Sequence, residues 1–347
     1  MDEIGYVMYI EDITRAASCQ LPWYKLSGKN ILITGATGLI GSAVIDILMA
    51  RREVDYHVFA LGRNVDRANK LFSSYFESSF FHFIQHDIIN PLPTNFPYHY
   101  IIHAASGANP IIYSTDPVGV MKANIYGTEN LLSYGKNHNL EKFVFVSSGD
   151  IYGEGDGRKF TENYSGYVNP LELRSCYSSS KRATETLCIA YGNQYGIDVS
   201  IARPSHTYGP HFTESDTRVY AQFINNVVKG ENIVMKSSGE QYRSWCYVVD
   251  CALGILYIAL KGESGIAYNV ADENSNITIR ELAEMIANIA GKHVILELPL
   301  ERELAGFNPA TKSCFDTLKL RSLGWLPSAT MKDNIVTTIK ERLVYEN

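Results

Sequence analysis

The fold of this chain is decided by the segment Asn30-Ile-Leu-Ile-Thr34-Gly35-Ala36-Thr37-Gly38-Leu39-Ile40-Gly41. A β-branched run leads into three glycines spaced G-x-x-G-x-x-G, and helical periodicity follows over residues 42–50. In such a unit the first glycine permits a tight turn, the second lets a pyrophosphate approach the backbone, and the third lets helix and strand pack closely. The free N–H groups at the start of the helix can bind an anion. The segment therefore predicts a dinucleotide-binding loop with cofactor contacts from Gly35, Thr37, Gly38, Leu39, Ile40 and Gly41.

Short β-branched runs alternate with longer helical patterns on both sides of this segment. The expected strands are 30–34, 57–61, 81–85, 100–103, 143–147 and 199–203. The expected helices include 42–50, 118–134 and 177–195, the last with Ala183, Leu187, Ala190 and Tyr191 on one apolar stripe. This order predicts an α/β protein with a Rossmann-like, doubly wound parallel sheet.

The strand-helix rhythm ends at a Gly209-Pro210 turn. Beyond it we expect the helices 219–229 and 278–290, with short strands between them. The expected organisation is an N-terminal arm over residues 1–27, a dinucleotide-binding domain over 28–208 with some later segments returning to it, and mainly a smaller α/β substrate lobe over 209–347. The arm could pack on the sheet or against a partner chain.

The composition is that of a folded globular protein, with 347 residues, 46% of them apolar and 20% charged. A net charge of −6 gives no basic field, so we expect neither nucleic acid nor a membrane as a partner. The six cysteines form neither a C-x-x-C pair nor a cluster with histidine, so we expect no metal site and no disulfide framework. An acidic N-terminal region and the lack of a bilayer-length apolar run predict a cytoplasmic protein with reduced thiols.

A tyrosine and a lysine define the expected catalytic helix. Tyr177-Ser-Ser-Ser-Lys181 places a phenol and an ammonium group one helical turn apart. A nearby cation favours the phenolate, so we expect a lowered pKa that makes Tyr177 a proton acceptor from an alcohol. Ser148 follows a strand at the carboxyl edge of the sheet, where open α/β sheets bind ligands, and can bond the same substrate oxygen. These features predict an enzyme, with a non-catalytic NAD(P) sensor as the alternative class.

The strand that follows the glycine loop ends in Leu61-Gly62-Arg63 and not in an acidic residue. A carboxylate at this place accepts the ribose hydroxyls of NAD, whereas an arginine can accommodate the 2′-phosphate of NADP. Both cofactors therefore stay open. Asp87, which precedes Ile88 after the third strand, is placed to accept a hydrogen bond from the adenine amino group.

Further motifs occur in the same order along the chain. They are His103-Ala-Ala-Ser106, Asn124-Ile-Tyr-Gly127-Thr128, Ile151-Tyr152-Gly153, Arg203-Pro204, Tyr208-Gly209-Pro210, Arg243 with Tyr247-Val-Val-Asp250, and Leu323-Gly-Trp-Leu-Pro327. With them the chain resembles the extended short-chain dehydrogenase/reductases that modify nucleotide sugars, described as the NAD-dependent epimerase/dehydratase family. Within this family it is most similar to the UDP-glucuronate decarboxylases, over residues 164–188 and 216–219.

The resemblance implies a transient 4-keto sugar. Tyr177 would take the C4 hydroxyl proton, the C5 carboxylate would leave as carbon dioxide, and Asp150 would lie close to C5. The NDP-sugar 4,6-dehydratases and 4-epimerases begin in the same way and stay as alternatives. A homodimer is implied as well, built on the helices 118–134 and 177–195. The implied catalytic residues are Ser148, Asp150, Tyr177 and Lys181; further cofactor contacts are Arg63, Asp87, Ile88, Ala104, Ala105, Tyr177, Lys181 and Arg203; substrate contacts are Ser106, Tyr113, Ser148, His206, Arg218 and Arg243.

Three positions depart from the decarboxylase pattern. Asp150 stands where glutamate is usual, Gly62-Arg63 replaces the acidic cofactor residue, and His206 stands where asparagine is usual. The shorter carboxylate and the imidazole lead us to expect a different placement of the substrate.

Overall fold

The computed structural model describes residues 3–51, 53–93, 96–213, 215–297 and 312–346. A seven-stranded sheet in the order β10-β6-β5-β4-β1-β2-β3 forms its centre, and every neighbouring pair in it is parallel. The strands are β1 (Lys29–Thr34), β2 (Tyr56–Gly62), β3 (Phe81–Gln85), β4 (Tyr100–His103), β5 (Lys142–Val146), β6 (Val199–Pro204) and β10 (Ala267–Val270). The predicted Rossmann-like sheet is confirmed, and each of its six expected strands ends within one residue of its observed bounds.

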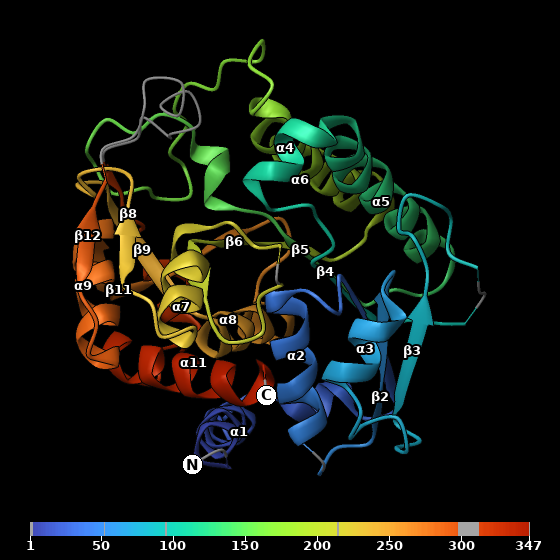
Figure 1. The fold of residues 1–347 in the computed structure, drawn as a ribbon. Helices are drawn as coiled ribbons and strands as arrows, with labels where there is room; N and C mark the ends of the chain where they lie inside the picture. The colour runs from blue at the N-terminus through green and yellow to red at the C-terminus, as the bar shows by residue number, and fades with distance from the viewer. Residues whose placement is uncertain (1–2, 52, 94–95, 214, 298–311, 347) are drawn as a thin grey trace.

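Helices cover both faces of the sheet (Figure 1). One face carries α2 (Leu39–Ala50), α3 (Val65–Leu71) and α8 (Val248–Lys261), and the other carries α5 (Pro117–Asn137) and α6 (Ser175–Tyr195). The alternation of side chains along β1 explains this, because Ile31 and Ile33 enter the core under α2 while Leu32 enters the core under α5. Both cores are needed to bury a sheet that is apolar on both faces.

The apolar stripe expected on α6 is not the buried side of this helix. Ala183 and Ala190 are exposed, while the buried side of the helix carries mostly polar groups. These are Tyr177, Ser180, Lys181, Thr184, Glu185 and Cys188. Tertiary hydrogen bonds from this side to β5 and β6 outweigh the apolar pattern, since a buried polar group is stable when it is bonded.

A smaller lobe lies beside the sheet, at the left in Figure 1. Strand β9 (Tyr242–Tyr247) pairs with β7 (His206–Tyr208), β11 (Asp272–Thr278) and β13 (Lys312–Ser313), and β8 (Ile233–Met235) pairs with β12 (Val294–Leu296). Helices α7 (Val219–Val228) and α9 (Ile279–Ala290) confirm the two helices expected there. Because α8 and β10 return to the first core and sheet, the chain crosses between the two regions more than once.

The N-terminal residues pack on this chain. Helix α1 (Glu3–Ala17) lies against α11 (Met331–Glu346) and α2 (Figure 1), and the 3₁₀ turn η1 (Trp23–Leu26) follows it. Tyr9 donates a hydrogen bond to Asp46 of α2 at 2.8 Å, and Tyr247 donates one to Asp12 at 3.1 Å. The boundaries at residues 28 and 208 stay a prediction.

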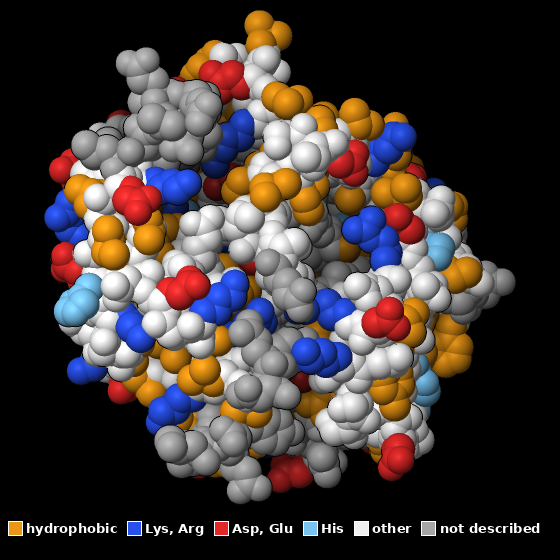
Figure 2. Space-filling model, viewed as in Figure 1, with side chains coloured by type: hydrophobic (Ala, Val, Ile, Leu, Met, Phe, Trp, Pro, Cys, Tyr) orange, Lys and Arg blue, Asp and Glu red, His pale blue; other side chains and the backbone are white. Residues whose placement is uncertain are grey.

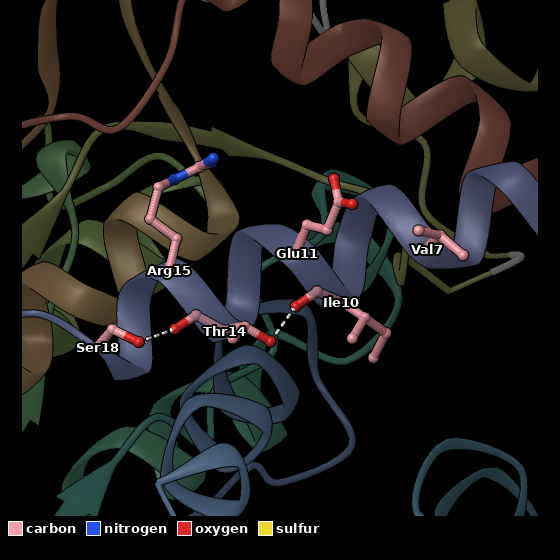
Figure 3. Close-up of a pocket in the computed structure, with 6 residues that line it drawn as sticks. All are labelled: Val7, Ile10, Glu11, Thr14, Arg15 and Ser18. Carbon is pink, nitrogen blue, oxygen red and sulfur yellow. Dashed lines mark hydrogen bonds between the residues drawn. The ribbon is translucent and has the colours of Figure 1, made fainter.

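The outward side of α1 carries a shallow depression, shown in Figure 3. Its lining consists of Val7, Ile10, Glu11, Thr14, Arg15 and Ser18. Thr14 and Ser18 donate their hydroxyl groups to carbonyl oxygens of the same helix, at 2.7 and 2.8 Å. A depression lined by one helix, with its hydroxyls already bonded, lacks the converging polar groups of a ligand site. No helix among the described residues is long and apolar enough to cross a membrane.

Candidate active site

The glycine loop has the geometry that a bound pyrophosphate requires. Gly35 adopts φ +67°, and a Cβ atom there would lie 2.7 Å from the carbonyl carbon of Ala104. A Cβ atom at Gly41 would lie 2.3 Å from the carbonyl oxygen of Gly35. Helix α2 begins behind Gly38 without a side-chain cap, so its first N–H groups face the loop unbonded by any side chain. These residues therefore fit a dinucleotide, with Ala104 and Ala105 at its side.

Side chains at the ends of β1 and β4 fix the loop that carries Ala105. Thr34 and His103 share a hydrogen bond of 2.6 Å, and the Ala105 N–H donates to the Thr34 hydroxyl at 3.4 Å. Burial, aided by Lys181, lowers the pKa of His103 to about 3, so the imidazole is neutral. Ser106, next in the chain, donates to Asn124 of α5 at 2.8 Å. The rim of the site is thus held from both the sheet and α5.

Lys181 points from α6 into the end of β5. Its Nζ donates to the Val146 carbonyl oxygen at 2.8 Å and lies 4.5 Å from the centre of the Phe145 ring. It is 5.8 Å from the centre of the Tyr177 ring. Burial lowers the pKa of Lys181 to about 7, although Glu185 opposes the shift. The side chain therefore lies under the sheet edge and beside Tyr177.

The pKa of Tyr177 differs from the expectation. Burial, followed by the charge of Asp150, raises it well above its usual value, while a hydrogen bond with Ser148 and the charge of Arg218 oppose this. The predicted lowering by Lys181 is wrong for the chain by itself, because burial dominates and the ammonium group is bonded to the backbone. The ring of Tyr177 stacks on Tyr113, 4.9 Å between centroids.

The turn that carries Asp150 is fastened to the catalytic helix. Ser148 accepts a hydrogen bond from the Asp150 N–H at 3.1 Å and begins the 3₁₀ turn η2 (Gly149–Tyr152). Arg182 of α6 donates to the Ile151 carbonyl oxygen at 2.6 Å and to that of Gly166 at 2.8 Å. The charge of Asp150 contributes to the raised pKa of both Tyr177 and Tyr113, after burial, so its carboxylate lies near both phenols.

Three arginines surround this carboxylate and phenol. Arg243 lies at the start of β9, Arg218 precedes α7, and Arg174 precedes α6. All three lower the pKa of His206, after burial. Figure 2 shows lysine and arginine side chains around the hollow near the middle of this face, between the sheet and the smaller lobe. An overall acidic chain therefore has a basic pocket, as an anionic substrate requires.

Arg174 was missed as a site residue. It follows Leu173 at the N-cap of α6, three residues before Tyr177, and its position on the catalytic helix was the available signal. Arg67 of α3 was missed as well. It donates to the Thr37 carbonyl oxygen at 2.8 Å and to that of His211 at 2.6 Å, so it connects the glycine loop to the segment after β7.

Arg63 and Asp87, which are both expected to contact the cofactor, form an ion pair with each other. Arg63 is 3.6 Å from Asp87, and its side chain is 78% exposed. Ile88 is buried against Gly127 of α5, where a Cβ atom would lie 3.0 Å from it. Asp87 is thus paired with Arg63, and Ile88 packs its loop against α5, while their contact with the cofactor stays a prediction.

Arg203 occupies a buried network away from the glycine loop. It donates to both oxygens of Glu185, at 3.0 and 2.6 Å, to the Tyr152 hydroxyl at 3.1 Å and to the Glu162 carbonyl oxygen at 2.7 Å. Each of its three nitrogens has a protein partner. The structure thus gives Arg203 the task of joining β6 to α6, and its contact with the cofactor stays a prediction.

The fold and the site together define a class: a Rossmann protein with a tyrosine, a lysine and a serine at the carboxyl edge of its sheet, the arrangement of a short-chain dehydrogenase/reductase. The chain belongs to the NAD dependent epimerase/dehydratase family, whose family model matches residues 31–271. The resemblance stated from the motifs is confirmed.

Within this family, the chain is similar to curated UDP-glucuronic acid decarboxylases. UDP-glucuronic acid decarboxylase 6 of Arabidopsis thaliana is 31% identical over 309 residues, which are 89% of this chain and 87% of that protein. UDP-glucuronic acid decarboxylase 1 of Xenopus tropicalis is 31% identical over 339 residues, 95% of this chain and 77% of that protein.

Solved structures share the fold over nearly the whole length of their own chains. The UDP-glucose 4-epimerase of Thermus thermophilus, solved with NAD, has a TM-score of 0.74 at 25% identity and covers 90% of this chain and 98% of its own. The dTDP-glucose 4,6-dehydratase of Streptomyces venezuelae, solved with NAD, has a TM-score of 0.77 at 23% identity and covers 89% of this chain and 95% of its own.

Proposed function

We propose that this chain is an NAD-dependent UDP-glucuronate decarboxylase that acts through a transient 4-keto sugar. The observation that carries the proposal is the grouping of a carboxylate, Asp150, with the guanidinium groups of Arg218 and Arg243 beside the Tyr177 phenol. An acidic sugar bound to a diphosphate needs such positive groups. The similarity to UDP-glucuronic acid decarboxylases supports the same substrate.

NAD, when bound, supplies the hydride acceptor for C4 and returns the hydride later. The glycine loop and the start of α2 would hold its pyrophosphate, with Ala104 and Ala105 alongside. Lys181 would hold the nicotinamide ribose. The proposal favours NAD over NADP because Arg63 is paired with Asp87, which reduces the charge it offers to a 2′-phosphate.

The residues of the chain perform the proton transfers. Tyr177 accepts the proton of the C4 hydroxyl, and Ser148 bonds the same oxygen. The resulting ketone makes the sugar a β-keto acid, so carbon dioxide leaves while Tyr177 and Ser148 stabilise the enolate oxygen. Asp150 lies near C5 and orients the ring or relays the proton that C5 receives.

The two arginines suit different anionic groups of this substrate. Arg218 donates through Nε to Asp216 at 3.0 Å, so this carboxylate partly compensates its positive charge. The remaining charge suits the single negative charge of the uronate. Arg243 bonds His206 and Gln241, both neutral, and the nearby carboxylate of Asp150 forms no ion pair with it, so its guanidinium group suits the diphosphate.

The substrate test is a panel of UDP, dTDP, GDP and CDP sugars, incubated with the purified protein and read by product mass. We expect loss of carbon dioxide from UDP-glucuronate. Loss of water from a neutral hexose would establish a 4,6-dehydratase, and an unchanged mass with altered sugar configuration a 4-epimerase. Both would overturn the decarboxylase proposal. Denaturing the same preparation and identifying the released dinucleotide tests NAD against NADP.

We further propose a homodimer through the outer sides of α5 and α6. Val118 and Tyr126 of α5 are 61% and 54% exposed, and Tyr195 of α6 is 40% exposed. Two packed helices with exposed apolar side chains suit a second copy of themselves. Sedimentation equilibrium should give twice the chain mass, and Tyr126→Glu should shift it toward the monomer; a monomeric wild type would contradict the proposal. A cytoplasmic location stays a prediction, which the six unpaired cysteines support.

A further inference from the structure

The imidazole of His206 and the guanidinium of Arg243 form a side-chain pair near Arg218 and Arg174. Arg243 Nη1 and His206 Nε2 are 3.1 Å apart. A guanidinium nitrogen is always a donor, so Nε2 must be the acceptor and carries no proton. The other ring nitrogen, Nδ1, therefore bears the hydrogen of a neutral imidazole.

The surroundings keep this imidazole neutral. Arg243 reaches it from β9, Arg218 from the segment before α7 and Arg174 from the segment before α6, and all three oppose a second positive charge. The ring also packs against Trp245, 5.3 Å between centroids, which is its partner in the β7–β9 register. Packing on Trp245 thus holds the ring, and the three arginines favour its neutral form, whose Nδ1 is buried without a hydrogen-bond partner among the described residues.

The two pocket arginines are held by different chemistry. Arg218 is bonded to the carboxylate of Asp216. Arg243 has two neutral acceptors, His206 Nε2 and Gln241 Oε1, and the described residues give it no ion pair within salt-bridge distance. A neutral acceptor orients a guanidinium without cancelling its charge, whereas a carboxylate does both.

We infer that His206 is a positioning residue that aims Arg243 at the diphosphate of the substrate and adds no negative charge of its own. This inference rests on the proposed function, since it assumes a nucleotide diphosphate in the pocket. The residue needed at position 206 is then a neutral acceptor of the right reach, and not a general base.

Substitutions at position 206 separate orientation from charge. His206→Asn offers a neutral amide acceptor. His206→Asp has almost the same shape as the asparagine variant but carries a negative charge, and His206→Leu removes the acceptor. The probe is UDP, titrated calorimetrically into the NAD-loaded protein. We expect His206→Asn to bind within about threefold of wild type, and both His206→Asp and His206→Leu to bind about tenfold or more weakly, the size of a lost charge-assisted bond.

Two further readouts distinguish positioning from a general loss of structure. The NAD content and the melting temperature of all three variants should stay near wild type, and kcat with UDP-glucuronate should fall less than KM rises. Nitrogen-15 NMR of His206 should show the proton on Nδ1.

Equal UDP affinity of His206→Asp and His206→Asn, or wild-type affinity of His206→Leu, would overturn the inference. A wild-type protein that binds no UDP would overturn the proposed function instead. In that case the NMR experiment still decides the pairing with Arg243, because a proton on Nε2 is incompatible with it.

Discussion

Tyr177→Phe is expected to lower kcat by about 10²–10⁴-fold, the range for loss of a general acid or base, while NAD stays bound. The change removes only the hydroxyl that faces Ser148 and Asp150. The ring stays, and with it the stacking on Tyr113 at 4.9 Å, so the helix and the cofactor site should keep their structure. The measurement is kcat with UDP-glucuronate together with the NAD content of the purified variant.

A matched control lies on the same helix. Tyr191 turns its hydroxyl toward Ser133 and Glu129 of α5, outside the cleft. Tyr191→Phe makes the same chemical change, and kcat should stay within about twofold of wild type because the residue contacts no reacting atom. If Tyr177→Phe retained activity within about tenfold of wild type, another group would have to carry the proton from C4.

The fold could be predicted from short-range patterns because a parallel sheet repeats them. The β1 strand, Gly35 turn and α2 helix depend on neighbouring residues, and the positions of the other strands follow from short buried apolar runs. The apolar pattern of α6 predicted the wrong buried side. Glu185 is buried because it accepts hydrogen bonds from Arg203, and Lys181 because it donates to the Val146 carbonyl oxygen. Those partners come from other strands, and no periodicity reveals them.

The site could be predicted where its residues stand at strand ends or on one helix. Ser148 and Tyr177 are brought together because β5 ends and α6 begins at the same edge. The bond from Arg67 to His211 spans 144 residues, and the place of Arg174 depends on the position of the smaller lobe. The raised pKa of Tyr177 could not be predicted from the sequence either, because its main cause is the burial of the side chain. Contacts of this kind follow from how the two lobes meet and from no local motif.

Asp150→Asn separates the first step of the proposed reaction from the later ones. The carboxylate faces Tyr177 and Arg243, and Ser148 fixes its backbone. An amide of the same shape keeps the 3₁₀ turn but neither relays a proton to C5 nor carries a charge. We therefore expect C4 oxidation to continue and the later steps to stall, with net turnover reduced by about 10²-fold or more. The near-ultraviolet absorbance of reduced nicotinamide should accumulate on the protein.

The pH dependence of this variant gives a second, independent readout. Asp150 is, after burial, the largest cause of the raised pKa of Tyr177. A raised pKa keeps the phenol protonated, so the base form gains as pH rises; removing the charge of Asp150 lowers that pKa and makes the base available at lower pH. The rate of nicotinamide reduction in Asp150→Asn should therefore rise at a lower pH than in wild type. Asp150→Glu, which keeps the charge, should leave that profile unshifted and serves as the control.

Unaltered product formation by Asp150→Asn would show that the carboxylate only shapes the turn. A stalled reaction without a shifted pH profile would instead place Asp150 at the C5 step alone, with no influence on Tyr177. The stalled and shifted variant is the expected result, because one carboxylate lies near the Tyr177 phenol, Tyr113 and Arg243. A single charge at that place can thus hold back the base in the resting enzyme and still act on the ring once C4 is oxidised.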